Sequence, residues 1–442
     1  MKKKVFKHIT IYICILLTVT GLLYCIYQYF FNPYRGVPDK IGISLDLHTI
    51  LSKEQALEDL DYIIEKLTER HPTCMDGLPE PVLKLYQKEK ENLSERVSVL
   101  ELWQAASRIL AAMKDGHTRT LYYPAKYYTL PVTFDFMDGK LTCTGTYDNK
   151  EISNVTVTEI GGFPVQKLYD TFLEQFSYEL ESYASYIFAK YLNRDIYLEF
   201  VGVDTSSDIE LTFEMDGKKE TVILPFMENP VVQTYEEEPF VSYEIDEKSS
   251  IGIFTLKHCT YNEVYKDTLK SFFKEVKDNN INSLIIDLRY NGGGNSMVAN
   301  EFMRYLNVDK YNSGTSHVRF GPYLLKNKMR PVTNKKYDSL TFEGQIYVLT
   351  STTTFSSAMD FAAIISDNKL GVVIGEIPGN MPSSYGDILQ FQAPNSKLSF
   401  SISYKYFIRP DETKNSEPLI PDYEIPAEDA LNKAKELIIL KS

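Results

Sequence analysis

From about residue 240 to the C-terminus, apolar strand patterns alternate with amphipathic helix patterns. Strand patterns occupy residues 250–256, 282–288, 345–350 and 370–376, and helix patterns stand between them at 264–276, 296–306 and 357–366. Apolar strands that alternate with helices are typical of a mostly parallel sheet with helices on both faces. The pattern therefore predicts an α/β fold for residues 240–440, with a β-hairpin over 388–404.

Two other regions precede this one. Capping boxes open two helical patterns, and they are formed by Ser52 with Gln55 and by Ser98 with Glu101. We therefore predict a small helical domain over residues 47–118. Residues 119–232 change to short alternating strand patterns with glycine turns, and helical patterns interrupt them near 165–192. This pattern predicts a small mixed domain, and the acidic stretch "YEEEPF" after it is read as a linker.

The N-terminal segment predicts a membrane anchor. The 23 residues from Ile9 to Phe31 carry no charge, and Lys2, Lys3, Lys4 and Lys7 precede them. A helix of about 20 apolar residues crosses a bilayer, and flanking lysines stay on the cytoplasmic side. Residues 1–8 are thus expected in the cytoplasm and the bulk of the chain outside. A cleaved signal peptide is the alternative, and a lipoprotein cleavage before Cys25 is disfavoured by the bulky Tyr24.

Composition narrows the function classes. The 442-residue chain has a net charge of -13, which argues against a nucleic-acid-binding protein with a basic surface. Outside the anchor, the cysteines are Cys74, Cys143 and Cys259, and no Cys/His spacing indicates zinc. One disulfide is allowed, but we interpret all three as buried thiols. Neither a metal nor another cofactor is implied.

Two adjacent serines, in "TTTFSSAMDF", stand where a strand pattern gives way to a helix pattern. Serines at such a junction are commonly helix caps, and we expect Ser356 to cap this helix. Ser357 would then lie on the first helical turn, where an exposed nucleophile also belongs, although no G-x-S-x-G motif is present. The Ala358 N–H and the helix dipole would favour a developing oxyanion there.

The glycine run in "LIIDLRYNGGGNS" predicts a turn with converging N–H groups. Gly292, Gly293 and Gly294 follow a buried strand pattern, and successive N–H groups in such a turn bind anions. The spacing fits neither a dinucleotide fingerprint nor a P-loop. Two interpretations of the glycine run remain: an ordinary tight turn or an oxyanion hole.

A serine nucleophile needs a base, and the chain has six histidines. His117 follows a helical pattern in "KDGHT", whereas His258 and His317 have no local signature. On the residues alone, His117 remains one candidate, with a structural role as the alternative.

Four motifs, "LIIDLRYNGGG", "TTTFSSAMDF", "VVIGE" and "NSEPLIPD", occur in this order. Together they resemble the C-terminal processing and tricorn-type serine peptidase family. The resemblance implies a crotonase-like (ClpP/crotonase) catalytic core over 240–440 and a PDZ-like domain over 119–232. It implies Ser357 as nucleophile and an oxyanion hole of Gly293, Gly294 and Ala358.

The chain departs from the family's Ser–Lys pattern. No lysine occurs in "GEIPGNMPSSYGD", where that branch carries one. The tricorn-like branch uses a histidine and a glutamate instead. By resemblance, His117 in "DGHT" is the base, and Glu417 in "SEPLIPD" supports it, with Asp411 and Glu412 as nearby alternatives.

The sequence thus predicts a membrane-anchored, extracytoplasmic serine peptidase without metal or cofactor. Its substrates would be polypeptides, held through a C-terminus by strand addition in the middle domain. Two alternatives stay open: a peptide-binding protein that has lost catalysis on the same scaffold, and a serine hydrolase that acts on other acyl groups, such as an esterase.

Overall fold

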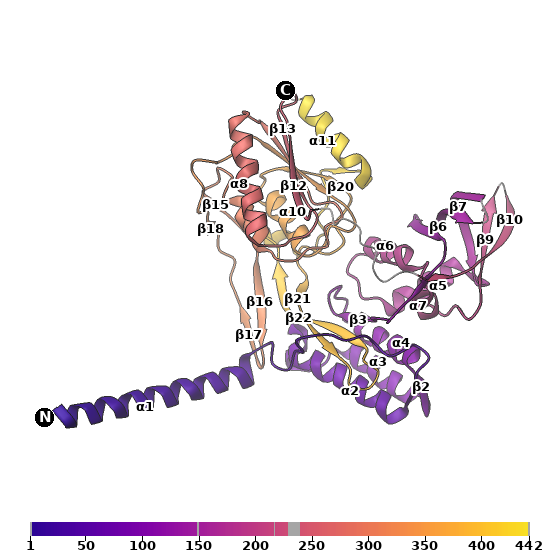
Figure 1. Ribbon diagram of the computed structural model, residues 1–442, viewed down its shortest axis with the longest axis horizontal. Coiled ribbons are helices and arrows are strands. Elements are labelled where there is room, and N and C mark those ends of the chain that lie inside the picture. Colours follow the sequence, from indigo (N-terminus) through magenta and orange to yellow (C-terminus); the bar gives the residue numbers. More distant parts are fainter. Residues whose placement is uncertain (1, 148–149, 216, 229–238, 441–442) are drawn as a thin grey trace.

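The protein is described by a computed structural model, which covers residues 2–147, 150–215, 217–228 and 239–440. Part of the expected acidic linker, residues 235–238, lies outside the described residues. A six-stranded sheet lies in the C-terminal half (Figure 1), in the order β12 (Val241–Asp246), β13 (Ile251–Leu256), β14 (Ser283–Asp287), β19 (Gln345–Thr350), β20 (Val372–Gly375) and β23 (Tyr423–Glu424). All neighbours pair parallel except β12 with β13.

Helices cover both faces of this sheet. One face carries α8 (Glu263–Asp278), α9 (Met297–Met303) and α10 (Ser357–Asp367), and the other carries α11 (Ala430–Ile439). Every residue of β14 is buried, as expected for a central strand covered on two sides. The predicted α/β fold with a mostly parallel sheet is confirmed.

A second sheet extends from this core toward the N-terminal helices (Figure 1). It contains β17 (Tyr323–Lys326), β16 (Thr315–Phe320), β22 (Ser399–Ile408) and β21 (Tyr385–Gln392) in that order. The predicted hairpin is β21–β22, and each strand is longer than expected. Strand β3 (Arg119–Leu121) pairs with β22, and Arg119 lies opposite Ser401. The segment that follows His117 is therefore part of the same sheet as the C-terminal hairpin.

The N-terminal region contains α2 (Lys53–Arg70), α3 (Glu80–Asn92) and α4 (Val99–Ala111), with short strands β1 (Ile50–Ser52) and β2 (Arg96–Ser98). Both predicted capping boxes are present. Each serine side chain accepts from the backbone N–H of its N3 residue, and the N3 side chain accepts from the backbone N–H of the serine. Helix α3 was not predicted.

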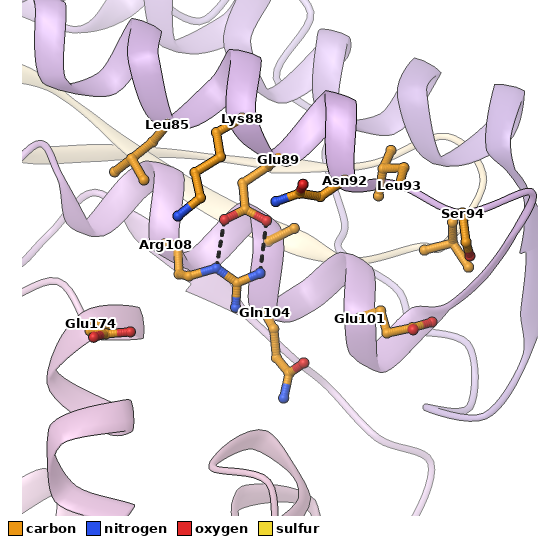
Figure 2. Close-up of a pocket in the computed structure, with 12 residues that line it drawn as sticks. Leu85, Lys88, Glu89, Asn92, Leu93, Ser94, Glu101, Gln104, Arg108 and Glu174 are labelled. Carbon is orange, nitrogen blue, oxygen red and sulfur yellow. Dashed lines mark hydrogen bonds and ion pairs between the residues drawn. The ribbon is translucent and has the colours of Figure 1, made fainter. Parts of the chain in front are cut away.

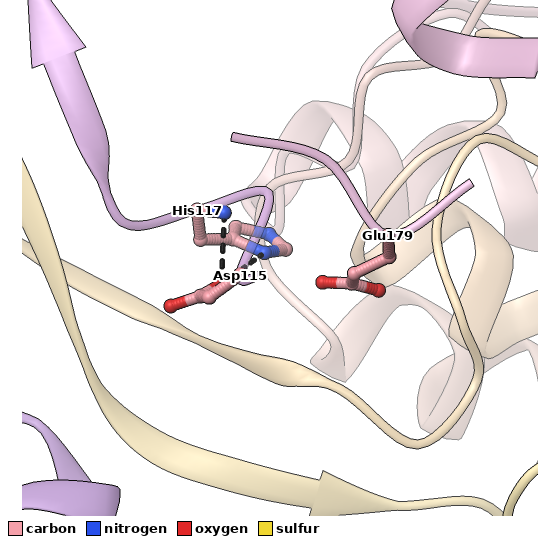
Figure 3. A group of neighbouring side chains, drawn as sticks. All are labelled: Asp115, His117 and Glu179. Atoms are coloured by element: carbon pink, nitrogen blue, oxygen red, sulfur yellow. Dashed lines mark hydrogen bonds and ion pairs between the residues drawn. The ribbon is translucent and has the colours of Figure 1, made fainter. Parts of the chain in front are cut away.

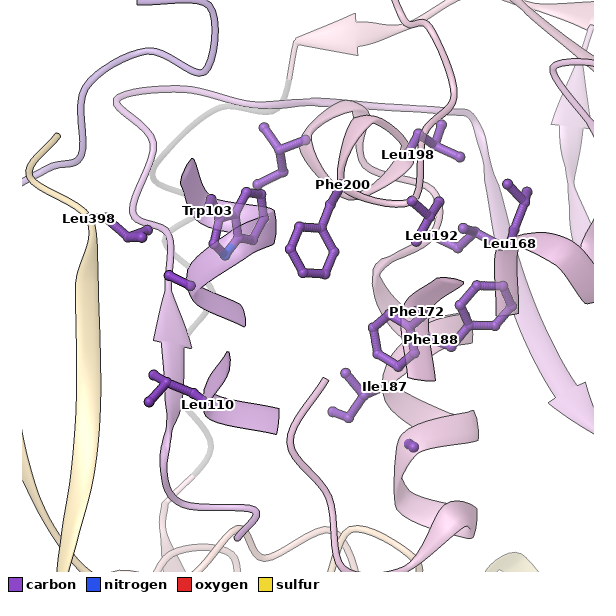
Figure 4. Packing of buried hydrophobic residues seen from close by; sticks show 14 of the residues in the cluster. Trp103, Leu110, Leu168, Phe172, Ile187, Phe188, Leu192, Leu198, Phe200 and Leu398 are labelled. Atoms are coloured by element: carbon purple, nitrogen blue, oxygen red, sulfur yellow. The ribbon is translucent and has the colours of Figure 1, made fainter. Parts of the chain in front are cut away.

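The middle region forms a sheet of β10 (Lys218–Leu224), β9 (Ile209–Met215), β7 (Lys150–Ile160), β6 (Lys140–Tyr147) and β5 (Val132–Met137), in that order. Its helices are α5 (Val165–Gln175), α6 (Glu181–Tyr191) and α7 (Asp195–Phe200). One hydrophobic core runs from these helices to α4 and the β21–β22 hairpin. Figure 4 shows Trp103 of α4 beside Phe200 of α7 in this core. The regions 47–118 and 119–232, which the sequence predicted as two domains, therefore share one hydrophobic core.

Several short elements complete the chain. They are β4 (Tyr128–Thr129), β8 (Phe163–Pro164), β11 (Met227–Glu228), β15 (Lys310–Tyr311), β18 (Val332–Thr333), η2 (Pro72–Asp76), η3 (Glu412–Lys414) and η4 (Ala427–Asp429).

The N-terminal helix α1 (Lys2–Ile26) continues as the π-helical turn η1 (Tyr27–Phe31) and projects away from the body (Figure 1). Over the described residues, the segment His8–Phe31 is long and apolar enough to cross a membrane, and none of it is buried. Signal sequences share these properties. Cys74, Cys143 and Cys259 are buried free thiols, as interpreted from the sequence.

Candidate active site

The two serines lie on a strained turn between β19 and α10. Ser356 has φ 53° and ψ −126°, a conformation that is uncommon and costly for a residue with a side chain. Its N–H donates to Asn380 Oδ1 at 2.7 Å, which holds the turn in place. The expectation that Ser356 caps α10 is wrong, because its side chain makes no capping hydrogen bond in this conformation.

Ser357 is the first residue of α10, and its side chain points toward the glycine turn. The residue is only 6% exposed, and its hydroxyl donates to the Gly294 carbonyl oxygen at 2.9 Å. No hydrogen bond joins Ser357 to His117 within the part of the chain that the structure describes.

The glycine turn is built against the two serines. Gly293 and Gly294 have φ 98° and φ 139°, which side chains rarely adopt. A Cβ on Gly293 would lie 2.7 Å from the Phe355 carbonyl oxygen, and one on Gly294 would lie 2.5 Å from that of Cys259. Only glycine fits at both positions, so the backbone can approach the serine turn closely.

The three predicted oxyanion donors differ in their availability. The Gly293 N–H donates to Asn291 Oδ1 at 2.9 Å, and the Ala358 N–H donates to the Phe355 carbonyl oxygen at 3.2 Å. Among the described residues, the Gly294 N–H has no acceptor. Gly294 also lines the cleft described below, so its N–H is the donor that is most available to a ligand.

His117 lies in the loop between α4 and β3, and its imidazole makes no hydrogen bond to the described residues. Both ring nitrogens are buried, and neither has a hydrogen-bond partner in the described parts of the chain. The backbone holds the residue in place, since its N–H donates to Asp115 Oδ1 at 2.9 Å and its carbonyl oxygen accepts from Ser401 Oγ at 2.6 Å. The ring packs against Phe355, with 4.9 Å between the centroids. Burial lowers the pKa of His117, against the opposing charge of Asp115.

Asp115 and Glu179 face His117 (Figure 3), and the sequence analysis assigned neither. The three side chains each offer an atom within 4.8 Å of the others. Asp115 Oδ1 lies 3.9 Å from His117 Nδ1, and Asp115 Oδ2 lies 3.2 Å from the fully buried His71 Nε2. Burial alone would raise the pKa of Asp115, but the hydrogen bond and charge of His71 hold it well below its usual range.

Glu179 closes the other side of this group, which is the one set of described residues that could hold a metal ion. Its carboxylate accepts from the backbone N–H groups of Gly116 at 3.3 Å and Met381 at 2.8 Å. Burial raises the pKa of Glu179 to about 8, and the charge of Asp115 adds to the effect. Asp115 stood inside the "KDGHT" motif, whereas no local pattern marks Glu179.

Glu417 is not brought into this group. It lies after η3 with an exposed side chain, and its carbonyl oxygen accepts from Arg409 at 3.0 Å. Its carboxylate makes no contact with His117 among the contacts of the described residues. The alternatives Asp411 and Glu412 lie in the same loop, and Asp411 caps η3.

A cleft of about 580 Å³ joins the elements of the site. His117, Ser356, Gly292 and Gly294 line it, together with Asp387. Three further basic residues also line the cleft: His258 and Lys190, which are exposed, and Arg119, which is half-buried. Asp360, in the first turn of α10, has a pKa raised to about 7 by burial and by the charge of Asp387.

A larger cavity of about 710 Å³ lies between α3 and α4 (Figure 2). The ion pair of Glu89 with Arg108 spans it, with N–O distances of 2.7 and 2.8 Å. None of the predicted site residues lines this cavity, so the smaller cleft is the candidate active site.

Residues 250–425 match the family model described as peptidase family S41. The chain carries an S41 peptidase domain. The protein is therefore a serine-type peptidase, and the matched segment contains the serine turn and the glycine turn. His117 lies outside the matched segment, so the S41 domain supplies only part of the cleft.

Solved structures extend the likeness beyond the S41 domain. Mature CPAF, in its complex with lactacystin, is 14% identical, with a TM-score of 0.64 over 88% of this chain and 99% of that one. The photosystem II D1 C-terminal processing protease is 13% identical, with a TM-score of 0.47 over 87% and 97%. At this identity, the likeness to CPAF shows a shared fold that includes the regions on the N-terminal side of the S41 domain.

Proposed function

We propose that this protein is a membrane-anchored, extracytoplasmic peptidase that cleaves polypeptides with Ser357 as nucleophile and His117 as base. The observation that carries the proposal is the cleft, where His117 from the N-terminal region lies with the serine turn and the glycine turn. These are the parts that acyl transfer needs: a nucleophile, a base and oxyanion donors.

The unpaired imidazole favours a catalytic role for His117. Buried polar atoms in native proteins are nearly always hydrogen-bonded, so a buried ring whose two nitrogens make no hydrogen bond to any described residue calls for a functional reason. Since burial lowers its pKa, His117 is neutral at neutral pH, as a general base must be.

In this account Ser357 changes its hydrogen-bond partner when substrate binds. Its hydroxyl leaves the Gly294 carbonyl oxygen and turns toward His117 by a change of χ1 rotamer. The exchanged hydrogen bond is worth about 1 kcal/mol, which substrate contacts readily offset. The Gly294 N–H then holds the oxyanion, the Ala358 N–H joins it by releasing the Phe355 carbonyl oxygen, and Gly293 shapes the turn.

Ser356 is the second candidate nucleophile. It lines the cleft directly and has the strained backbone of a sharp strand-to-helix turn. We favour Ser357 because it opens α10, where the helix dipole stabilises a developing anion, and because it stands at the family's nucleophile position.

Asp115 is the supporting carboxylate in this proposal, in place of the exposed Glu417. Its distance of 3.9 Å from His117 Nδ1 is longer than a hydrogen bond, and such contacts often tighten only when substrate is bound. The buried His71 keeps Asp115 ionised and oriented. Asp115 thereby stabilises the imidazolium that forms when His117 takes the serine proton.

For the architecture, we interpret residues 119–232 as a PDZ-like domain and the S41 domain as a crotonase-like core. The helix His8–Phe31 is interpreted as an anchor with residues 1–8 in the cytoplasm. Protease added to intact cells should then digest the ectodomain. Full protection of the ectodomain, or a mature soluble form that starts near residue 30, would contradict the anchor.

The function itself is tested by digestion of a defined peptide mixture. The purified full-length protein in detergent should cleave the peptides, and mass spectrometry should detect the new peptide termini. A Ser356→Ala/Ser357→Ala double variant should produce none. No cleavage by the wild type, with retained peptide binding, would favour an inactive peptide-binding protein. Hydrolysis of esters alone would favour a hydrolase that does not act on peptides.

A further inference from the structure

A second cavity, of about 410 Å³, adjoins the cleft. Trp103 of α4, the segment from β3 to Tyr127, and helices α5 to α7 line it. Four residues line both spaces: Arg119, Tyr183, Ile187 and Tyr191. A polypeptide that lies across the cleft at His117 therefore reaches this cavity, which we call the aromatic pocket.

Flat rings form the walls of the aromatic pocket. Trp103 stacks on Tyr122 and on Phe200, with centroids 5.0 and 4.2 Å apart, and Figure 4 shows the pair of Trp103 and Phe200. Tyr191 stacks on Tyr197 at 4.9 Å. Pockets of this size with aromatic walls bind large apolar groups and orient them through a few polar side chains.

The polar side chains of the pocket are positively charged. Arg119, Lys126 and Arg194 line it, and no aspartate or glutamate does, although the chain has a net charge of -13. Within the described parts of the chain, neither arginine guanidinium has a hydrogen bond or an ion pair. Half-buried guanidinium groups without an anion attract carboxylates, which match their planar fork.

Arg119 lies where the two spaces meet. It lines both, and its guanidinium carbon is 6.0 Å from the Phe176 ring centre. Arg194 lines the aromatic pocket but not the cleft, and it lies over the rings of Tyr127 and Tyr191 at 4.7 and 4.5 Å. Of the three pocket cations, Arg119 is therefore the one that also faces a substrate in the cleft.

We propose that the aromatic pocket is a specificity site for polypeptides in which a carboxylate stands beside an aromatic or other bulky apolar residue. The apolar side chain fills the pocket, and Arg119 binds the carboxylate. The carboxylate can come from an acidic side chain or from the chain's own C-terminus. This inference rests on the peptidase function proposed for the cleft, because the pocket selects what the cleft cleaves.

Trp103 allows binding to be measured without cleavage, because it is the single tryptophan of the chain and lines the pocket. The protein to use is the full-length Ser356→Ala/Ser357→Ala variant in detergent. The probes are acetylated alanine–glycine peptides in two matched pairs. One pair contains an internal Phe-Glu or Phe-Gln and is amidated, and the other ends in Phe as the free acid or the amide.

At least one acid probe should change Trp103 fluorescence and bind 10- to 100-fold more tightly than its neutral partner, the range for a hydrogen bond to a charged group. The pair that shows the preference identifies the source of the carboxylate. Arg119→Gln should remove the preference, and Arg194→Gln should reduce it. Arg96→Gln, an exposed arginine on β2, is the matched control and should leave it unchanged. Melting curves show that each variant is folded.

Equal binding of acid and neutral probes, or an unchanged preference in folded Arg119→Gln, would overturn the proposal. The outcomes also separate the two claims. Acid-selective binding at Trp103 with no cleavage by the wild type keeps the pocket and removes the peptidase role of the cleft. Cleavage of acid and neutral probes alike, with no response of Trp103, keeps the peptidase role and removes the pocket.

Discussion

The hydroxyl of Ser357 donates to the carbonyl oxygen of Gly294 at 2.9 Å, and the N–H of the same glycine has no acceptor among the described residues. The residue proposed as nucleophile therefore contacts the residue that carries the proposed oxyanion donor before any substrate binds. Ser357 is buried, and Ser356 and Gly294 beside it line the cleft. Release of this bond and rotation toward His117 are the steps that convert the site into its active arrangement.

Replacement of His117 tests the base. His117→Ala should lower kcat by about 10²- to 10⁴-fold, the usual contribution of a positioned proton-transfer group. His258→Ala is the matched control, because His258 lines the same cleft but is exposed, and it should keep most activity. Peptide turnover is compared at a temperature where melting curves show both variants to be folded.

A lysine base would contradict this assignment. Lys190 also lines the cleft, with an exposed side chain, so it is the lysine to test there. Lys190→Met, Lys369→Ala and Lys397→Ala should each remain active. A dead but folded lysine variant, together with an active His117→Ala enzyme, would restore a Ser–Lys mechanism.

The pH profile follows from the burial of His117. The neutral imidazole is the active form, so kcat/KM rises as pH increases through the pKa of His117. Because burial lowers this pKa, the rising limb should have its midpoint below about 6.5, the ordinary value for histidine. Asp115→Asn removes a charge that raises the pKa, so the midpoint should move lower still while kcat falls. A midpoint above 6.5, or no movement in folded Asp115→Asn, would contradict the arrangement.

The glycine turn gives a matched pair of substitutions. Gly293→Ala places a Cβ 2.7 Å from the Phe355 carbonyl oxygen at φ 98°, so it should destabilise the protein by at least about 1 kcal/mol and abolish turnover. Gly292→Ala meets nothing within 4 Å and has no positive φ, so its melting temperature should stay near that of the wild type. Thermal unfolding of the two variants is compared. Equal stability and activity would show that the close approach to the serine turn is unimportant.

Sequence patterns predicted those helices and strands that depend on interactions between residues close in the chain. The starts of α2 and α4 were predictable because a capping box joins residues three apart. Strand β14 was predictable because its three central residues, Leu284, Ile285 and Ile286, form an apolar run, and the whole strand is buried. Helix α3 was missed because only Val82 and Glu89 of its residues are buried, which leaves little apolar periodicity to read.

The features of the site that the sequence did not predict depend on tertiary contacts. Glu179 meets His117 only because α5 and α6 bring their connecting loop to the end of α4, and no spacing in the sequence encodes this. The backbone strain of Ser356 is imposed by Asn380 and the glycine turn. Glu417 was expected from a family motif, but the loop after η3 leaves its side chain in solvent.

The most direct test of the account compares turnover by Ser357→Ala and Ser356→Ala on one peptide mixture, with a fluorophosphonate label on the wild type. Loss of a nucleophile can lower the rate by about 10⁶-fold. The account predicts that loss for Ser357→Ala, measurable activity for Ser356→Ala, and the label on Ser357. A folded, inactive Ser356→Ala enzyme beside an active Ser357→Ala enzyme, with the label on Ser356, would contradict it.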